Sequence, residues 1–168
     1  MQANPDRIPP LDLTPELDAL WKPLSEAALR VLRSGQFVLG PEVAAFELEA
    51  AEFLGVDHAV GLNSGTDALV IGLRALGIEP GDEVITSPFS FFATAEAVSL
   101  LGATPVFVDI QAESFNLDPQ FVDSAITDRT RALLPVHLFG CPSDMDEFRR
   151  LAELHGLRVL EDCAQSFV

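Results

Sequence analysis

Basic residues are scarce in this sequence of 168 residues, and lysine is almost absent. Against 26 aspartates and glutamates there are 10 lysines and arginines, which gives a formal net charge of −16, and the one lysine is Lys22. This balance excludes binding to nucleic acid or to an anionic membrane through bulk electrostatics. Any phosphorylated ligand must therefore be held by local groups rather than by a basic surface.

Cysteines and long apolar runs are also few. Cys141 and Cys163 stand in no CxxC or Cys/His spacing, so we expect two reduced thiols and no metal site. No uninterrupted apolar run is long enough to span a bilayer, and no basic segment followed by an apolar one opens the sequence. We therefore expect a cytoplasmic protein with no membrane partner.

The chain does contain a composition typical of a globular core, with 48% hydrophobic residues and a length that suits one domain or a substantial piece of a larger one. Apolar periodicity and Gly or Pro punctuation predict helices over 14–33, 41–54, 66–76, 92–101, 119–126 and 144–155, and strands over 58–62, 83–86, 105–109, 132–136 and 158–161. Such alternation is typical of an α/β fold whose mostly parallel sheet is covered by helices on both faces.

The two N-terminal helices carry clear boundary signals. Pro15 stands at the first helical position of one, and Pro23 marks a possible kink inside it. For the second, which begins at Pro41, we predict a buried face of apolar residues at helical spacing, namely Val43, Phe46, Ala50 and Phe53. We divide the chain into an N-terminal arm and helix, 1–34, and a domain over 35–168.

Ligands of such sheets bind beyond the carboxyl ends of the strands. This rule selects five places in the sequence, which are 63–66, 87–92, Asp109, 137–140 and 162–166. The first contains a hydroxyl-rich turn, Ser64-Gly65-Thr66, that opens a helix. Unpaired backbone N–H groups and the positive end of the helix dipole can hold a phosphate there, although the same residue types are also ordinary helix caps.

Asp162 follows the last predicted strand, where a carboxylate is costly unless it meets a cation or several donors. Pyridoxal phosphate (PLP) has a protonated pyridine nitrogen that supplies such a cation, and a phosphate for the hydroxyl-rich turn. Gln165 could donate to the phenolate oxygen of its ring, and Phe91, or else Phe89 or Phe92, could stack on the ring face. Taken singly, each has a structural alternative: a helix cap, a surface residue or a core aromatic.

Between residues 8 and 167 the sequence resembles the N-terminal part of the DegT/DnrJ/EryC1/StrS family of PLP-dependent sugar aminotransferases. The stretches that carry the resemblance are PLDL at 10–13, GQFVLGPEV at 35–43, NSGTDAL at 63–69, PGDEVI at 80–85, SFFATA at 90–95, PVHLFG at 135–140, DMD at 144–146 and EDCAQ at 161–165. Together and in this order, the set is highly specific.

The resemblance implies a fold-type-I aminotransferase large domain, truncated before a small C-terminal domain. It also implies that Gly65 and Thr66 hold the cofactor phosphate. Phe91 would stack on the ring, Asp162 would pair with the pyridine nitrogen and Gln165 would contact the phenolate oxygen. In the family an amino group passes from glutamate or glutamine, through the cofactor, to a keto sugar linked to a nucleoside diphosphate, at a site between the two subunits of a homodimer.

Three positions depart from the family pattern. Glu96 stands where relatives often carry Asn, Cys163 where they often carry a small residue, and Phe139 fills an aromatic position in a chain without tyrosine. None of these disables the cofactor site. We interpret Cys163 as a packed thiol, because no basic neighbour lowers its pKa, and His137 as a structural group behind the site.

In the family, the lysine that forms a Schiff base with the cofactor lies downstream of EDCAQ. Lys22 does not replace it, because it falls in the first predicted helix. We therefore interpret the sequence as the N-terminal portion of a longer enzyme and expect this portion to be inactive alone. Three hypotheses follow: a sugar aminotransferase, a dehydratase of the same family with histidine in place of the lysine, and a non-catalytic or regulatory fragment.

Overall fold

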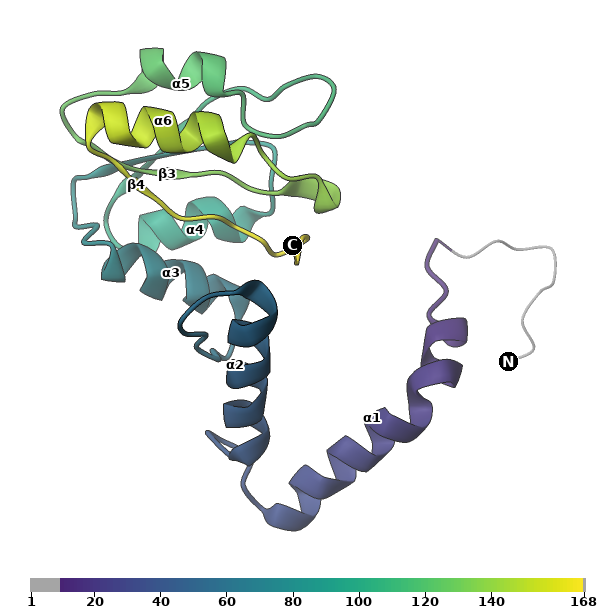
Figure 1. Ribbon diagram of the computed structural model, residues 1–168. Helices are drawn as coiled ribbons and strands as arrows, with labels where there is room; N and C mark the ends of the chain where they lie inside the picture. Colours follow the sequence, from purple (N-terminus) through teal and green to yellow (C-terminus); the bar gives the residue numbers. More distant parts are fainter. Residues whose placement is uncertain (1–9, 168) are drawn as a thin grey trace. The chain divides into compact units, whose positions relative to one another are not determined.

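A computed structural model describes residues 10–167, so most of the predicted N-terminal arm lies outside the described residues. The elements are α1 (Thr14–Ser34), α2 (Pro41–Leu54), α3 (Gly65–Ala75), β1 (Glu83–Thr86), α4 (Phe92–Leu100), β2 (Thr104–Phe107), α5 (Pro119–Ala125), β3 (Thr130–Leu134), a 3₁₀ turn (Leu138–Gly140), α6 (Met145–His155) and β4 (Arg158–Val159) (Figure 1). The chain divides into two compact units between Gly61 and Leu62. Within residues 10–167, no helix has the combined length and apolar character of a membrane span.

The first unit contains α1 and α2, and both confirm the predicted boundaries. Each helix has a proline in its first turn. Proline suits this position because its φ angle is already helical and because a backbone N–H there would have no partner within the helix. A left-handed glycine ends each one, Gly35 at φ 67° and Gly55 at φ 65°. The α1 helix continues through Pro23 and has no buried residue.

The predicted buried face of α2 is wrong for its two aromatic residues. Phe46 and Phe53 are 57% and 65% exposed, and the buried residues of the helix are Ala50 and Ala51. The Val56 N–H donates to the Ala51 carbonyl oxygen at 3.0 Å and closes the C-terminal turn of the helix. The chain then returns along the side of Glu47 and Ala51, where the Gly61 N–H donates to Glu47 Oε1. Small side chains occupy this side because the returning backbone lies close to the helix.

The strand predicted over 58–62 is also wrong, since this segment is irregular. Its backbone meets a side chain rather than a neighbouring strand, because the Gly61 N–H donates to Glu47 Oε1 at 2.7 Å. A Cβ built on Gly61 would lie 3.2 Å from the Val43 side chain, so glycine permits this close approach. A strand needs a backbone partner, which an apolar pattern alone does not supply.

The second unit is built on four parallel strands in the order β2-β1-β3-β4. β1 has its predicted range, and β2 and β3 begin and end one or two residues earlier than predicted. β4 is shorter than predicted, but pairing resumes beyond it at a parallel bridge between Val136 and Asp162. The Asp162 N–H donates to the Pro135 carbonyl oxygen at 2.9 Å, and the His137 N–H donates to the Asp162 carbonyl oxygen at 3.1 Å. Asp162 is therefore tied to the sheet through its backbone.

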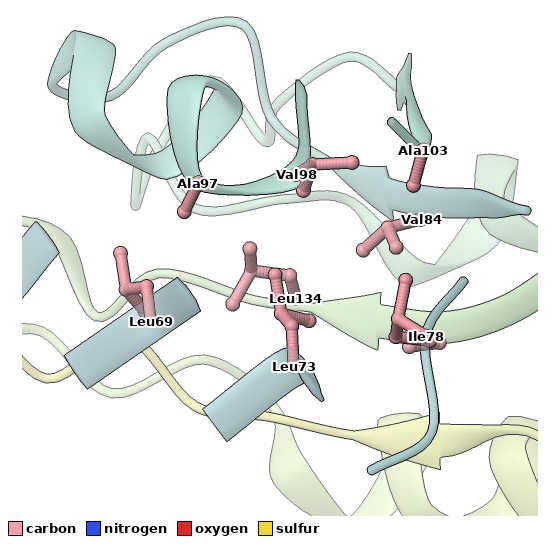
Figure 2. Close-up of a cluster of buried hydrophobic side chains, with 9 residues drawn as sticks. Leu69, Leu73, Ile78, Val84, Ala97, Val98, Ala103 and Leu134 are labelled. Carbon is pink, nitrogen blue, oxygen red and sulfur yellow. The ribbon is translucent and has the colours of Figure 1, made fainter. Parts of the chain in front are cut away.

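Alternate strand residues enter two apolar cores, one on each face of the sheet. The core under α3 and α4 (Figure 2) contains Leu69, Leu73, Ile78, Val84, Ala97, Val98, Ala103, Ala132 and Leu134. The core under α5 and α6 contains Ile85, Val108, Leu117, Val122, Leu133, Phe148, Leu151 and Ala152. Neighbouring residues of one strand, such as Val84 and Ile85, thus point to opposite faces. The prediction of a parallel sheet with helices on both faces is confirmed.

Candidate functional site

A cavity of about 450 Å³ lies in the second unit at the carboxyl edge of the sheet. The start of α3, the start of α4 and the segment after β4 line it with Gly65, Thr66, Ala68, Leu69, Phe91, Ala93, Thr94, Glu161, Asp162, Cys163 and Ala164. Four of the six predicted cofactor-binding residues therefore share one cavity, and Ser64 and Gln165 do not line it. None of these lining residues is basic, so an anion here would rely on backbone groups and hydroxyls.

The hydroxyl-rich turn begins α3, and Ser64 is the residue that caps the helix. Its Oγ accepts the Asp67 N–H at 3.1 Å and donates to Asp67 Oδ2 at 2.9 Å. Asn63 Nδ2 donates to the same carboxylate oxygen at 2.7 Å. The Ser64 hydroxyl is thus used within the cap, which favours the capping alternative for this residue.

Gly65 and Thr66 are the first two residues of α3, so their N–H groups have no carbonyl partner within the helix. A Cβ built on Gly65 would meet no atom within 4 Å, and its φ is not in the left-handed region. Neither packing nor backbone conformation within the described chain therefore requires glycine at this position. Its small size instead leaves the two N–H groups open to a ligand.

Asp162 is the buried carboxylate of the cavity, with 6% of its surface exposed. Thr94 Oγ1 donates to its Oδ2 at 2.9 Å, and the Ala164 N–H donates to its Oδ1 at 3.1 Å. Among the ion pairs of residues 10–167, none includes Asp162. Hydrogen bonds satisfy both oxygens while the charge has no cation, an arrangement that a cationic ligand group would complete.

Of the three aromatic residues considered for ring stacking, Phe91 lines the cavity and the other two do not. Phe91 stands at the N-cap of α4 with extended backbone, and its side chain is 78% exposed. The Phe89 ring packs against Phe115 at 5.7 Å between centroids, and Phe92 is the first residue of α4. The structure therefore offers the uncovered face of Phe91 to a flat ligand.

Gln165 lies beside the cavity rather than in its wall. Its Oε1 accepts the Phe139 N–H at 2.7 Å, and it lines a smaller cavity of about 300 Å³ that also contains Phe91. Because a backbone N–H requires an acceptor, this contact identifies which end of the amide is the oxygen. The NH₂ group of Gln165 is the end that can donate to a ligand.

His137 supports the cavity wall from behind, in the structural role predicted for it. The ring is 5% exposed, its Nδ1 accepts the Ser143 N–H at 3.0 Å, and its Nε2 lies 3.0 Å from Glu161 Oε2. Because Nδ1 is an acceptor, the ring proton is on Nε2 and is donated to Glu161. His137 thereby orients the Glu161 side chain at the cavity.

Cys163 lies among acidic groups. Partial burial, and then the charges of Glu161 and Asp162, raise the pKa of its thiol. The raised pKa keeps the side chain as the neutral thiol at neutral pH, as expected of a residue that is not a nucleophile. The expectation that the thiol is packed is wrong, because Cys163 is exposed. One ligand atom each of Cys163, Glu161 and His137 lie within 4.8 Å of one another. A hydrogen bond joins two of these three groups, His137 and Glu161.

Thr94 is a site residue that the sequence pattern did not reveal. Its side chain is 2% exposed and touches Asp162, although it lies in the SFFATA stretch. The available signal was the pair of hydroxyl residues Ser90 and Thr94, which are four positions apart at the start of a helix. That spacing brings two side chains to one face of a helical turn.

Sequence comparison places the chain in a known family. A model of the DegT/DnrJ/EryC1/StrS aminotransferase family matches residues 21–168, and the chain belongs to this family. A dTDP-3-amino-3,4,6-trideoxy-alpha-D-glucose transaminase of Streptomyces venezuelae is 52% identical over 165 residues, which are 98% of this chain and 44% of that protein. The chain therefore spans less than half the length of this relative.

Solved structures confirm the fold class. DesV of S. venezuelae matches with a TM-score of 0.92 and 52% identity, covering 96% of this chain and 43% of that one. NtdA of Bacillus subtilis, solved with bound cofactor PMP, matches with a TM-score of 0.87 and 38% identity, covering 98% of this chain and 38% of that one. The described sheet and helices are thus those of the corresponding part of an aminotransferase of this family.

Proposed function

We propose that this chain supplies the PLP pocket of an aminotransferase that moves an amino group from glutamate or glutamine to a nucleotide-linked keto sugar. The observation that carries the proposal is Asp162, a buried carboxylate with two hydrogen-bond donors and no cationic partner in residues 10–167. The start of α3, with two open N–H groups, lines the same cavity. A pyridinium nitrogen and a phosphate, carried by one molecule, match these two features.

Each residue of the site would then have one task. PLP supplies, when bound, an electron sink for the bond changes at the amino-bearing carbon. Asp162 would keep the ring nitrogen protonated, and Phe91 would cover one ring face. Gly65 and Thr66 would bind the phosphate through N–H groups and a hydroxyl, and the NH₂ group of Gln165 would donate to the phenolate oxygen. Ser64, in this scheme, holds the first turn of α3 in shape.

The proposal requires a Schiff-base lysine from outside this sequence. The one lysine present, Lys22, is an exposed residue of α1. The relatives described above are more than twice as long as the matched segment, so we expect the lysine in a longer form of the protein. We also expect a homodimer, which would cover the exposed apolar side chains of α1, among them Trp21 and Leu32.

Equilibrium binding of PLP to the 168-residue chain tests the pocket. We expect saturable binding of one PLP per chain, weakened by inorganic phosphate because both compete for the start of α3. Binding that does not saturate, or that phosphate leaves unchanged, would contradict the proposal. A chain with Lys22 replaced by arginine is the matched control, because it removes the one side-chain amine that could form a Schiff base with the PLP aldehyde and leaves the cavity intact.

Borohydride reduction after PLP binding separates the three hypotheses. We expect a longer form of the protein to gain the mass of one reduced cofactor outside residues 1–168, and to aminate a nucleotide-linked keto sugar. A longer form that binds PLP, gains no adduct and dehydrates the sugar would support the lysine-less dehydratase. A longer form without turnover of either kind would support the non-catalytic alternative.

A further inference from the structure

Two hydroxyl groups are linked in a series of hydrogen bonds that ends at the Asp162 carboxylate. Ser90 Oγ lies 3.0 Å from Thr94 Oγ1, and Thr94 Oγ1 lies 2.9 Å from Asp162 Oδ2. Thr94 and Asp162 are 2% and 6% exposed, so water competes little for the second contact. The proposed cofactor contacts give a role to Asp162 and none to these hydroxyls.

The chemistry of the Asp162 carboxylate decides which group donates in each of these hydrogen bonds. An ionised carboxylate can only accept hydrogen bonds, so the Thr94 hydroxyl donates to Asp162. The Thr94 oxygen is then the acceptor for the Ser90 hydroxyl, and each donation strengthens the next. The Ala164 N–H donates to the other carboxylate oxygen, so rotation of the carboxylate would break at least one of these bonds.

We propose that Thr94 is a positioning residue for the ring nitrogen of PLP, acting through the Asp162 carboxylate, and that Ser90 reinforces it. The inference rests on the proposed function. The Thr94 hydroxyl and the Ala164 N–H fix the plane of the carboxylate, because each of them donates to one of its two oxygens. Asp162 is thereby held ready to pair with a protonated ring nitrogen.

The same element sets the position of the stacking residue. Ser90, Phe91 and Thr94 lie at the start of α4, and Ala97 and Val98 of that helix are fully buried in the core beneath it. A helix anchored in this way moves as a unit. The start of α4 would therefore position both the residue that stacks on the PLP ring and the residue that supports the contact with the ring nitrogen. Loss of the Thr94 hydroxyl should weaken the nitrogen contact and leave the stacking of Phe91 unchanged.

A pair of cofactor analogues tests this. Binding of PLP to the 168-residue chain is compared with binding of 1-deaza-PLP, in which a CH group replaces the ring nitrogen. Thr94→Val keeps the shape and removes the donor, and we expect it to weaken PLP binding about tenfold and 1-deaza-PLP binding less than about twofold. Thr94→Ser keeps the donor and should bind PLP like the wild type. Ser90→Ala should weaken PLP binding about threefold.

The outcomes separate this inference from the proposed function. Equal weakening of both compounds by Thr94→Val would assign Thr94 to packing alone and would overturn the inference while PLP binding stands. Wild-type protein that binds neither compound would overturn the proposed function and the inference with it. Should Thr94→Val not fold, the same comparison of PLP with 1-deaza-PLP is made with Ser90→Ala. This substitution is expected to disturb folding less, because Ser90 is half-buried and precedes α4.

The double variant Thr94→Val with Asp162→Asn gives a second readout. If Thr94 acts through Asp162, the double variant should bind PLP no more weakly than Asp162→Asn alone. Losses that add would show that Thr94 acts independently of the carboxylate and would overturn the inference.

Discussion

The two ends of the cavity are built in different ways. The α3 end, Gly65 and Thr66, consists of neighbouring residues whose N–H groups are open because a helix begins there. The Asp162 end, Asp162 and Thr94, joins side chains that are 68 positions apart in the sequence. The comparison shows that an anion site can be a local property of the chain, whereas a buried acid with its donors is a property of the packed fold.

The two ends also differ in charge. The α3 end has the positive partial charge of a helix N-terminus and no basic side chain. At the Asp162 end, Glu161 and Asp162 both line the cavity, and no basic residue accompanies them there. A ligand with an anionic and a cationic group therefore has a matching partner at each end.

The largest expected effect comes from removing the charge at the Asp162 end. Asp162→Asn should weaken PLP binding about 100-fold, because the pyridinium loses its counter-charge in a buried position. Equilibrium binding measures this. The control is Asp109→Asn, which changes an exposed aspartate that also follows a strand and does not line the cavity. Equal effects of the two variants would contradict the assignment of Asp162.

At the α3 end we expect a smaller effect. Gly65→Val should weaken PLP binding about tenfold, because its side chain would cover the open N–H groups. Gly65→Ala should leave the free energy of unfolding within about 0.5 kcal/mol of the wild type, because the added Cβ has no contact within 4 Å. Urea unfolding checks the second expectation, and Gly65→Ala should show a weaker binding defect. A large loss of stability would mean that glycine is structurally required here.

Ser64 should affect stability more than binding. Ser64→Ala removes the cap of α3 and should lower the free energy of unfolding by about 1 kcal/mol, while PLP affinity changes less than about threefold. Ser64→Asp retains a capping acceptor and should recover most of the stability. If Ser64→Ala instead weakens PLP binding as strongly as Gly65→Val, the Ser64 hydroxyl contacts the phosphate, and Ser64 belongs to the phosphate-binding residues together with Gly65 and Thr66.

The smallest expected effect is on the reactivity of Cys163, which reports the charge of the Asp162 end. Its raised pKa means that less thiolate is present at any pH below that value, so alkylation by iodoacetamide should be slower at neutral pH than for an unperturbed thiol. Glu161→Gln removes one of the charges that raise the pKa and should speed alkylation a few-fold. Peptide mass analysis separates Cys163 from Cys141. Unchanged alkylation in Glu161→Gln would show that this charge does not act on the thiol.

Signals that act within a few residues predicted most of the elements. Prolines at helix starts and glycines after helix ends predicted α1, α2 and α6, because each sets the backbone of its own position. The two errors concern residues that need a distant partner. The strand expected over 58–62 has no ladder, and Phe46 and Phe53 are exposed because the chain returns over the alanines of α2.

Apart from the segment 58–62, the sequence by itself determined the order of helices and strands, and it also determined the open start of α3 at Gly65 and the acid that follows the last strand. These depend on residues within about four positions of one another, where caps and backbone preferences act. Only the tertiary structure decided that Phe91 rather than Phe89 lines the cavity and that Thr94 donates to Asp162. Those contacts depend on how α4 packs against the sheet, and one residue's hydroxyl cannot indicate in advance which distant carboxylate the packing will bring to it.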